Sequence, residues 1–411
     1  MNTMISASEA AKRCASAARI LIAGCAAEPV AVLDVVAANP ALWQGRILTG
    51  AFIPGVNDRD FSALGMATRV ETIFATPGLQ VSKSVGEIAH LPMHYSAFWS
   101  RLARPGLVDL VLMAVPPPAH DGTVGYGLAC DFAPAAIAAG ARLIGVVNPL
   151  MPDPPGSPRL PLSRFEALAE GTAALPQLAS APVDAANRQI AAQIVARIPD
   201  GGTLQLGLGK LQTAVLAELA TTGRKDLAYH AGMISDAILD VMDAGVFGRG
   251  ITTGVALGST AFYDQVGRDA RINWRPVGTT HRHDTLAALP GLVSVTSVLE
   301  VDLTGQANAE YFRGRQVSGQ GGLMDFVRGA RAAQGGLAIL ALPSTAGAQS
   351  RIVARLDPGA PISVPRADVD LVITEHGVAD LREASLSERA ERLIAIAAPE
   401  FRKALSQGAT L

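Results

Sequence analysis

Short apolar runs recur along this chain and alternate with alanine-rich stretches of helical periodicity. The runs occupy residues 19–23, 107–115, 142–147, 203–206, 337–342 and 370–374. Helical patterns follow two of them, one beginning at Pro29 and one over residues 213–219. Runs this short and this uniformly apolar are typical of parallel strands that are covered on both faces. The alternation therefore predicts an α/β fold with mainly parallel sheets and helical crossovers.

The chain is too long for one ordinary domain. Its 411 residues favour two domains, each with a core of its own. The stretch PLMPDPPGSPRLPLS, at residues 149–163, is so rich in Pro, Gly and Ser that it cannot continue a helix or a central strand. We expect the domain boundary shortly after it, with one α/β domain over residues 1–180 and a second over residues 181–411.

The charge pattern and the cysteines limit the partners and the compartment. The formal net charge is −2 and the 34 basic residues form no dense run, so neither nucleic acid nor an anionic membrane is indicated as a partner. Cys14, Cys25 and Cys130 form no CxxC pair, and three cysteines cannot build a disulfide framework, which favours a reducing compartment. The N-terminus lacks the apolar core of a signal peptide and no run has the length of a membrane helix. We expect a cytoplasmic protein that acts on small molecules and forms a homo-oligomer such as a homodimer.

The sequence VSGQGGLMDFVR, at residues 317–328, is the strongest local signal for a binding site. Gly319, Gly321 and Gly322 let the backbone approach a bulky group closely, and the helix predicted after them offers free N–H donors. A tight turn before a helix would leave the same pattern. This segment alone leaves both interpretations open.

Several segments, read together, resemble one protein family. In the second half these are LQLGLGKLQTAV at 204–215, SVTSVLEVDLTGQANAE at 294–310, SGQGGLMDFVRGA at 318–330 and TEHGVADL at 374–381. In the first half they are GCAAEP at 24–29, VPPPAHDGTVGYG at 115–127 and VVNPLMPDPPG at 146–156. Their residues and their order along the chain resemble the motifs of the acetyl-CoA hydrolase/transferase family, which includes the 4-hydroxybutyrate CoA-transferases of class I. The resemblance covers nearly the whole chain.

This resemblance implies two α/β domains of CoA-transferase type with the active site in the cleft between them. Coenzyme A would be bound as the acyl-CoA substrate, and no metal would be needed. The SGQGG loop would lie along the thioester, where its N–H groups would stabilise the negative charge that acyl transfer builds on the oxygen. The substrate-binding and CoA-binding residues expected from the matched motifs are Ser318, Gly319, Gln320, Gly321, Gly322, Gly207, Gly209, Met233 and Thr296.

The chain departs from the family at the catalytic position. Members use a glutamate in a segment of the form H-T-E-M-[IL]-S-D-G, which attacks the thioester and forms a glutamyl-CoA intermediate. Here the segment is HAGMISDA at 230–237, and Gly232 occupies the position of that glutamate. Without a side chain there, the covalent relay is lost. Gln212, Thr296 and Ala398 also replace the family's typical Pro, Asn and His, which suggests a re-purposed site.

The remaining polar residues leave several mechanisms open. His230 can act as a general base near neutral pH, although it can equally serve only to hold its loop. Glu300 and Glu310 match acidic positions of the family and are interpreted as structural, while His281 and His283 are expected to be solvated. No GxSxG, HExxH or CxxC motif occurs. The open functions are direct acyl transfer to an acceptor, hydrolysis of acyl-CoA, CoA transfer through a surrogate carboxylate, and acyl-CoA binding without catalysis.

Overall fold

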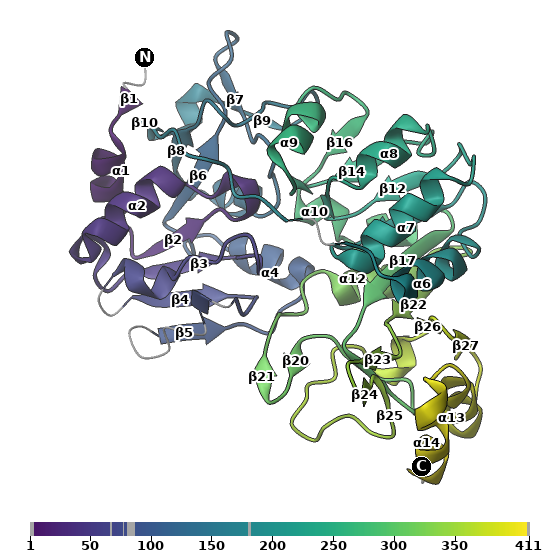
Figure 1. Cartoon of the computed structure of the whole chain (residues 1–411). Coiled ribbons are helices and arrows are strands. Elements are labelled where there is room, and N and C mark those ends of the chain that lie inside the picture. Colours follow the sequence, from purple (N-terminus) through teal and green to yellow (C-terminus); the bar gives the residue numbers. More distant parts are fainter. Residues whose placement is uncertain (1–3, 66–67, 77, 80–86, 180–181, 409–411) are drawn as a thin grey trace. The chain divides into compact units, whose positions relative to one another are not determined.

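The chain divides into two compact units (Figure 1). The computed structural model describes residues 4–65, 68–76, 78–79, 87–179 and 182–408. The first unit comprises Met1–Ala179, Gly232–Asp236 and Thr252–Thr280, and the second comprises Ser180–Ala231, Ala237–Ile251 and His281–Leu411. The predicted domain boundary between residues 180 and 181 lies outside the described residues. The predicted α/β class with mainly parallel sheets is confirmed.

The first unit is built on an eight-stranded sheet whose neighbouring strands are all parallel. In spatial order the strands are β1 (Met4–Ile5), β10 (Ala167–Glu170), β8 (Arg142–Val147), β6 (Leu110–Val115), β2 (Arg19–Ile22), β3 (Ile47–Gly50), β4 (Arg69–Thr72) and β5 (Glu87–His90). Every residue of β6 is buried, as expected for a strand covered on both faces.

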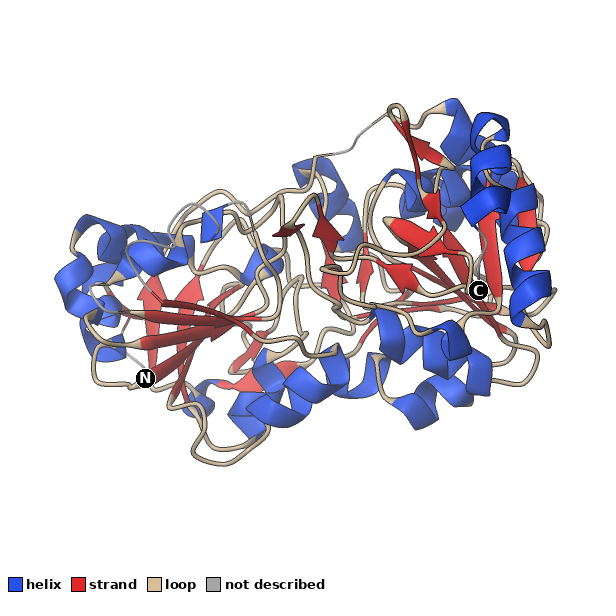
Figure 2. Cartoon of the chain, turned by 90° about the horizontal axis from the view of Figure 1, so that it is seen from below, coloured by secondary structure: helices blue, strands red, loops and turns tan. Residues whose placement is uncertain are grey.

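Helices lie against both faces of this sheet (Figure 2). Residues of α1 (Ala7–Cys14) and α2 (Val30–Ala38) share one apolar cluster with Ile20, Leu112 and Ile144 of the strands. The alternate residues of the same strands, including Leu21 and Leu143, are buried as well. The other principal helices of this unit are α4 (Tyr95–Leu102), α5 (Ala133–Ala138), α9 (Thr260–Val266) and α10 (Val277–Thr280).

The second unit has its own sheet, in the order β12 (Ala228–His230), β11 (Thr203–Leu206), β17 (Leu292–Ser297), β22 (Leu337–Ala341), β26 (Leu371–Thr374) and β27 (Gly377–Asp380). These pairs are parallel except β26 with β27, which are antiparallel. The helices are α6 (Ala185–Val195), α7 (Lys210–Ala220), α8 (Ile238–Asp243), α11 (His283–Ala287), α12 (Leu323–Ala332), α13 (Leu386–Ala395) and α14 (Pro399–Gly408). Among the described residues, none of the chain's helices has the length and apolar character needed to span a bilayer.

Short strands decorate both units. In the first they include β7 (Thr123–Gly125), β9 (Arg159–Pro161), β13 (Met233–Ile234) and β15 (Val255–Ala256). β14 (Ile251–Thr253), whose first residue belongs to the second unit, and β16 (Ile272–Trp274) bring the number of strands in the second sheet to eight. In the second they are β18 (Glu300–Asp302), β19 (Ala307–Asn308), β20 (Tyr311–Phe312), β21 (Arg315–Gln316), β23 (Thr345–Ala346), β24 (Gln349–Ser350) and β25 (Ile352–Val353). Single 3₁₀ turns are η1 (Cys25–Ala27), η2 (Pro40–Trp43), η3 (Phe61–Leu64), η4 (Leu162–Arg164) and η5 (Arg366–Asp368).

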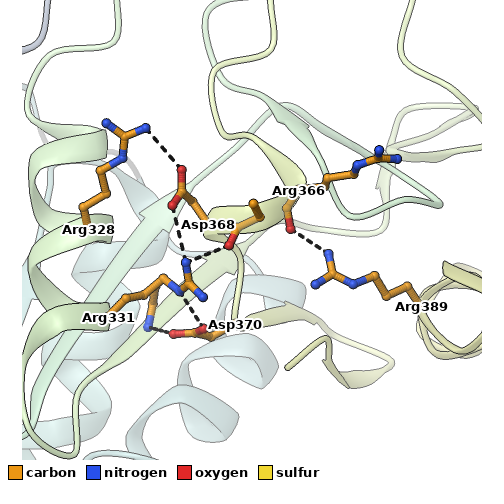
Figure 3. A network of polar contacts seen from close by, with 8 residues as sticks. Arg328, Arg331, Arg366, Asp368, Asp370 and Arg389 are labelled. Carbon is orange, nitrogen blue, oxygen red and sulfur yellow. Dashed lines mark hydrogen bonds and ion pairs between the residues drawn. The ribbon is translucent and has the colours of Figure 1, made fainter. Parts of the chain in front are cut away.

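A network of ion pairs fixes α12 in the second unit (Figure 3). Arg331 on α12 donates through Nε to Asp370 Oδ1 at 3.0 Å, and Asp370 Oδ2 accepts the backbone N–H of Ala338 at 3.0 Å. Arg328, one turn earlier on the same helix, pairs with Asp368 of η5 at 3.3 Å. Because Asp370 immediately precedes β26, the network joins the C-terminal half of α12 to the sheet.

Candidate functional site

The SGQGG loop at residues 318–322 leads directly into α12. The backbone N–H of Ser318 donates to the carbonyl of Glu310, and the N–H of Leu323 donates to the carbonyl of Gln320. Gly321 has a φ of 54°, in the left-handed region that favours glycine. A Cβ at Gly322 would lie 2.4 Å from Nε2 of His281, so a larger residue would collide with a buried imidazole. Local geometry therefore favours glycine at both positions, whatever the loop binds.

A second glycine loop follows β11. Gly209, at the N-cap of α7, has a φ of 129° and no side chain caps the helix there. No atom of the described chain lies within 4 Å of where a Cβ on Gly207 would be, so the loop borders open space. Such an uncapped helix start offers backbone N–H donors to a ligand. Thr296 lies at the carboxyl end of the adjacent strand β17 and is half-buried.

The position of this loop in the sheet is also favourable for binding. From β11 the chain goes to β12 on one side and later to β17 on the other, so the strand order reverses between β11 and β17. In open parallel sheets, ligands bind outside the carboxyl ends of the strands at such a reversal. Gly207 and Gly209 follow the carboxyl end of β11, and Thr296 lies at the carboxyl end of the paired strand β17. That these residues bind the substrate stays a prediction.

His230 ends β12 in the second unit and is buried, with 5% of its surface exposed. His281 is nearby, because the charge of His230 contributes to the lowered pKa of His281. Burial is the larger cause, and together they lower the pKa of His281 to about 3. His281 packs against Phe326 of α12 with ring centroids 4.6 Å apart. His281, whose imidazole is neutral, thus lies near His230 and also against Gly322 of the SGQGG loop.

The expectation that His281 is solvated is wrong. Only 2% of its surface is exposed, because it fills the space between Gly322 and Phe326. His283, two residues later, is exposed as expected. Among the described residues, no group of three or more His, Cys, Asp or Glu side chains could hold a metal ion.

Gly232 and Met233 belong to the first unit, unlike the other predicted site residues. The carbonyl of Gly232 accepts the N–H of Gly254 at 3.2 Å, and Met233 pairs with Val255 in a parallel ladder. Asp236 accepts hydrogen bonds from the N–H of Ser259 at 3.1 Å and from its hydroxyl at 2.5 Å. The segment 232–236 is therefore fixed in register along its length.

A buried carboxyl that the sequence analysis missed lies close to this segment. The carbonyl of Gly254 accepts the N–H of Cys130 at 2.9 Å, so Gly254 joins the strand of Gly232 to residues 129–131. Asp131 follows Cys130, and its Oδ1 accepts the N–H of Phe132 at 2.7 Å. Burial raises the pKa of Asp131 from 3.8 to about 6. Its sequence context, CDFAP, carries no signal of burial.

Cys25 lies in the same part of the first unit. It is 1% exposed, and η1, which it begins, packs against β15. Its φ is 54°, and its backbone N–H donates to Asn57 Oδ1 at 2.8 Å. Burial, followed by the charges of Asp131 and Glu28, raises the pKa of the Cys25 thiol well above its usual value. A thiol in this environment stays protonated and is therefore a poor nucleophile.

Glu310 and Glu300 both contact the segment that precedes the SGQGG loop. Burial raises the pKa of Glu310, whose backbone carbonyl accepts the N–H groups of Val317 and Ser318. Glu300 Oε2 accepts from Asn308 Nδ2 at 3.5 Å. These contacts favour the interpretation of both residues as structural.

Comparisons with known proteins agree with this architecture. Residues 1–157 match the acetyl-CoA hydrolase/transferase N-terminal domain, and residues 258–409 match the C-terminal domain of the same family. A 4-hydroxybutyrate coenzyme A transferase of Clostridium kluyveri is 30% identical over 98% of this chain and 96% of its own length. A succinyl-CoA:cyclohexane-1-carboxylate CoA transferase of Geobacter metallireducens is 34% identical over 74% of this chain and 71% of its own.

A solved structure gives the same result. RipA from Yersinia pestis superposes with a TM-score of 0.91, is 28% identical, and covers 99% of this chain and 96% of its own. Two family domains in the expected order, together with a relative matched along nearly its full length, leave one conclusion: the chain belongs to the acetyl-CoA hydrolase/transferase family.

Proposed function

We propose that this protein is an acyl-CoA-dependent acyltransferase that moves the acyl group directly from CoA to an acceptor, without a glutamyl-CoA intermediate. The observation that carries the proposal is Gly232, which stands where the family's motif has its nucleophilic glutamate. The similarity to CoA transferases and the family itself support acyl-CoA as the substrate.

The contacts around Gly232 fix the register of segment 232–236 within the fold. A slip of the segment by one residue would break the Gly232–Gly254 hydrogen bond and the pairing of Met233 with Val255 together. The nearest carboxylate in sequence, Asp236, is held by two hydrogen bonds from Ser259 and is not free to replace a glutamate. Direct transfer is therefore favoured over a relay through a residue of this segment.

His230 is the proposed general base. His281, its buried neighbour, has a pKa of about 3 and binds protons too weakly to accept one near neutral pH. In the proposed step, His230 takes a proton from the acceptor, and the acceptor attacks the thioester carbonyl. The carbon–sulfur bond to CoA breaks, and the CoA thiolate leaves and is protonated. The N–H groups of the SGQGG loop would stabilise the developing oxyanion, together with those at the start of α7.

The test measures release of free CoA thiol from a series of acyl-CoA thioesters, with and without candidate acceptors. Acyl transfer predicts release that depends on the acceptor, and no enzyme-bound thioester that borohydride can reduce. His230→Ala should lower the rate while binding of CoA, measured by calorimetry, is retained. Release at the same rate without an acceptor would refute direct transfer.

Hydrolysis is the second candidate, because the family to which the chain belongs includes hydrolases. It predicts steady thiol release in the absence of any acceptor, lost in His230→Ala. A bound thioester trapped by borohydride and located by mass spectrometry would instead identify a surrogate carboxylate. Binding of CoA without turnover of any thioester would identify a non-catalytic acyl-CoA-binding subunit.

A further inference from the structure

Gln212 is a buried side chain with an unused hydrogen-bond acceptor. It lies in the first turn of α7, and only 4% of its surface is exposed. Its Nε2 donates to the hydroxyl of Ser297 at 3.0 Å. Its Oε1 is inaccessible to solvent and accepts no hydrogen bond from any described residue. Leaving a buried oxygen without a donor is unfavourable, so a native site with this arrangement calls for a missing partner.

The unused oxygen lies near the carboxyl ends of β11 and β17, where the strand order of the sheet reverses. Ser297 is the last residue of β17, and α7 follows β11, so the Gln212–Ser297 hydrogen bond spans the point of strand-order reversal. Oε1 is 3.0 Å from where a Cβ on Gly209 would be, which places it against the glycine loop. The same loop borders open space at Gly207.

The chemistry of an amide oxygen restricts what can satisfy it. A carboxylate offers only acceptor oxygens and would be repelled by Oε1, whereas a hydroxyl, an amine or an amide N–H can donate to it. In this structure Nε2 donates to Ser297 and the amide oxygen faces the loop at Gly209. The first N–H groups of α7 can at the same time accommodate an oxygen of the same ligand.

We propose that Gln212 is a specificity residue whose Oε1 accepts a hydrogen bond from an N–H or O–H group of the ligand at the carboxyl ends of β11 and β17. The inference rests on the proposed function and deepens it, because it selects a donor group over a carboxylate at this place. Two parts of the reaction carry such a group: the amide N–H groups of the pantetheine arm of CoA, and an N–H or O–H group of the acceptor other than the one whose proton His230 takes.

Three variants separate binding from stability. Gln212→Met keeps a similar volume and removes the acceptor. Ser297→Ala removes only the hydroxyl that holds Nε2 and leaves Oε1 in place. Thr203→Val is the matched control, because Oγ1 of Thr203 is also buried without a partner among the described residues but lies at the opposite end of β11. All three are compared with the wild type in melting temperature.

Two measurements distinguish the sources of the donor. Calorimetry gives the Kd for CoA, and steady-state kinetics with acetyl-CoA gives the KM for hydroxylamine, a donor-bearing acceptor, and the inhibition constant of propionate, a carboxylate without a donor that competes with it. Enzyme-free hydroxylaminolysis is subtracted. Loss of one hydrogen bond predicts a rise of about 3- to 10-fold for Gln212→Met. A rise in the Kd for CoA assigns the pantetheine arm, and a rise confined to the KM for hydroxylamine assigns the acceptor.

The remaining outcomes are equally decisive. Thr203→Val should change neither constant, and Gln212→Met should melt no lower than Ser297→Ala, because it removes an unsatisfied oxygen. If Gln212→Met leaves every constant within about twofold of the wild type, or weakens propionate alone, the assignment of Gln212 is wrong. If the wild type binds CoA but turns over nothing, the proposed function fails while the calorimetry still decides the role of Gln212. Absence of both binding and turnover in the wild type would overturn both.

Discussion

Asp131 predicts a pH-dependent loss of stability that one substitution should remove. The carboxyl is buried and its pKa is raised from 3.8 to about 6 by burial. The folded state therefore holds the proton more tightly than the unfolded chain does. The stabilisation by this proton is complete below the unfolded pKa and is lost as the pH rises through the folded one. Two units of pKa correspond to about 3 kcal/mol in total, of which about 2 kcal/mol is lost between about pH 4.5 and pH 8.

Asp131→Asn keeps the shape of the side chain and its Oδ1, which accepts the N–H of Phe132. The amide does not ionise, so the variant should gain about 2 kcal/mol relative to the wild type on going from about pH 4.5 to pH 8. The pKa of Glu28 is also raised by burial, but this residue titrates in both proteins, so its contribution cancels when the two unfolding free energies are subtracted. Cys25 and Cys130, the neighbouring thiols, remain neutral throughout because burial raises the pKa of both.

The assay is urea unfolding of both proteins at a series of pH values, followed by far-UV circular dichroism. The quantity compared is the difference in unfolding free energy between variant and wild type, with the slopes checked for equality. A difference that is flat over this pH range would refute the assignment of a raised pKa to Asp131. A difference that falls as the pH rises would mean that the carboxylate is stabilised in its charged form.

Three further predictions follow from residues outside this carboxyl. Gly232→Glu should acquire a borohydride-sensitive enzyme–CoA thioester and transfer of CoA from acetyl-CoA to propionate, detected by mass spectrometry and chromatography; a folded variant with neither would argue that this position is not that of the family's nucleophile. Asp370→Asn should lower the unfolding free energy by about 1.5–3 kcal/mol, because the carboxylate accepts hydrogen bonds from Arg331 and from the N–H of Ala338. The control Asp380→Asn, at the exposed pair with Arg382, should change it by less than about 0.5 kcal/mol. Equal effects of the two variants in urea unfolding would contradict this. Burial raises the pKa of Cys14 to about 12 and raises the pKa of Cys25 and of Cys130 further. No thiol of the native protein should therefore react rapidly with a disulfide reagent at about pH 8, and all three should react in urea. A fast-reacting thiol in the native protein would show that one of the three is accessible.

Local patterns in the sequence predicted much of the fold. The runs at 142–147 and 203–206 form β8 and β11 at the same residues, because fully apolar segments of this length have few alternatives to a buried strand. The glycines of the two loops were equally readable, since Gly209, Gly321 and Gly322 serve local geometry. The Pro-rich stretch at 149–163 contains no α-helix and no strand of the two large sheets, as predicted; its end forms β9, which pairs with β7 in a separate two-stranded sheet.

Features set by long-range contacts could not be predicted in this way. His281 looked solvated in a charged stretch, yet Phe326 and Gly322, more than 40 residues away, enclose it. The raised pKa of Asp131 comes from burial, and the backbone partners of residues 130 and 131 are Gly254 and Val277, far along the chain, which no pattern near Asp131 predicts. The unused oxygen of Gln212 likewise depends on Ser297, which comes from another strand.

The division of the chain into units has a practical consequence for anyone who wishes to dissect it. The segments Gly232–Asp236 and Thr252–Thr280 belong to the first unit although they follow most of the first part of the second. A polypeptide that stops near residue 180 would lack β13 and β15, and with them the partners of Leu128 and Cys130. The carbonyl of Leu128 and the N–H of Cys130 would lose these partners, and buried apolar residues beside them would be exposed, which favours aggregation. Neither unit corresponds to one continuous stretch of gene, so the two have to be synthesised, and fold, as parts of one molecule.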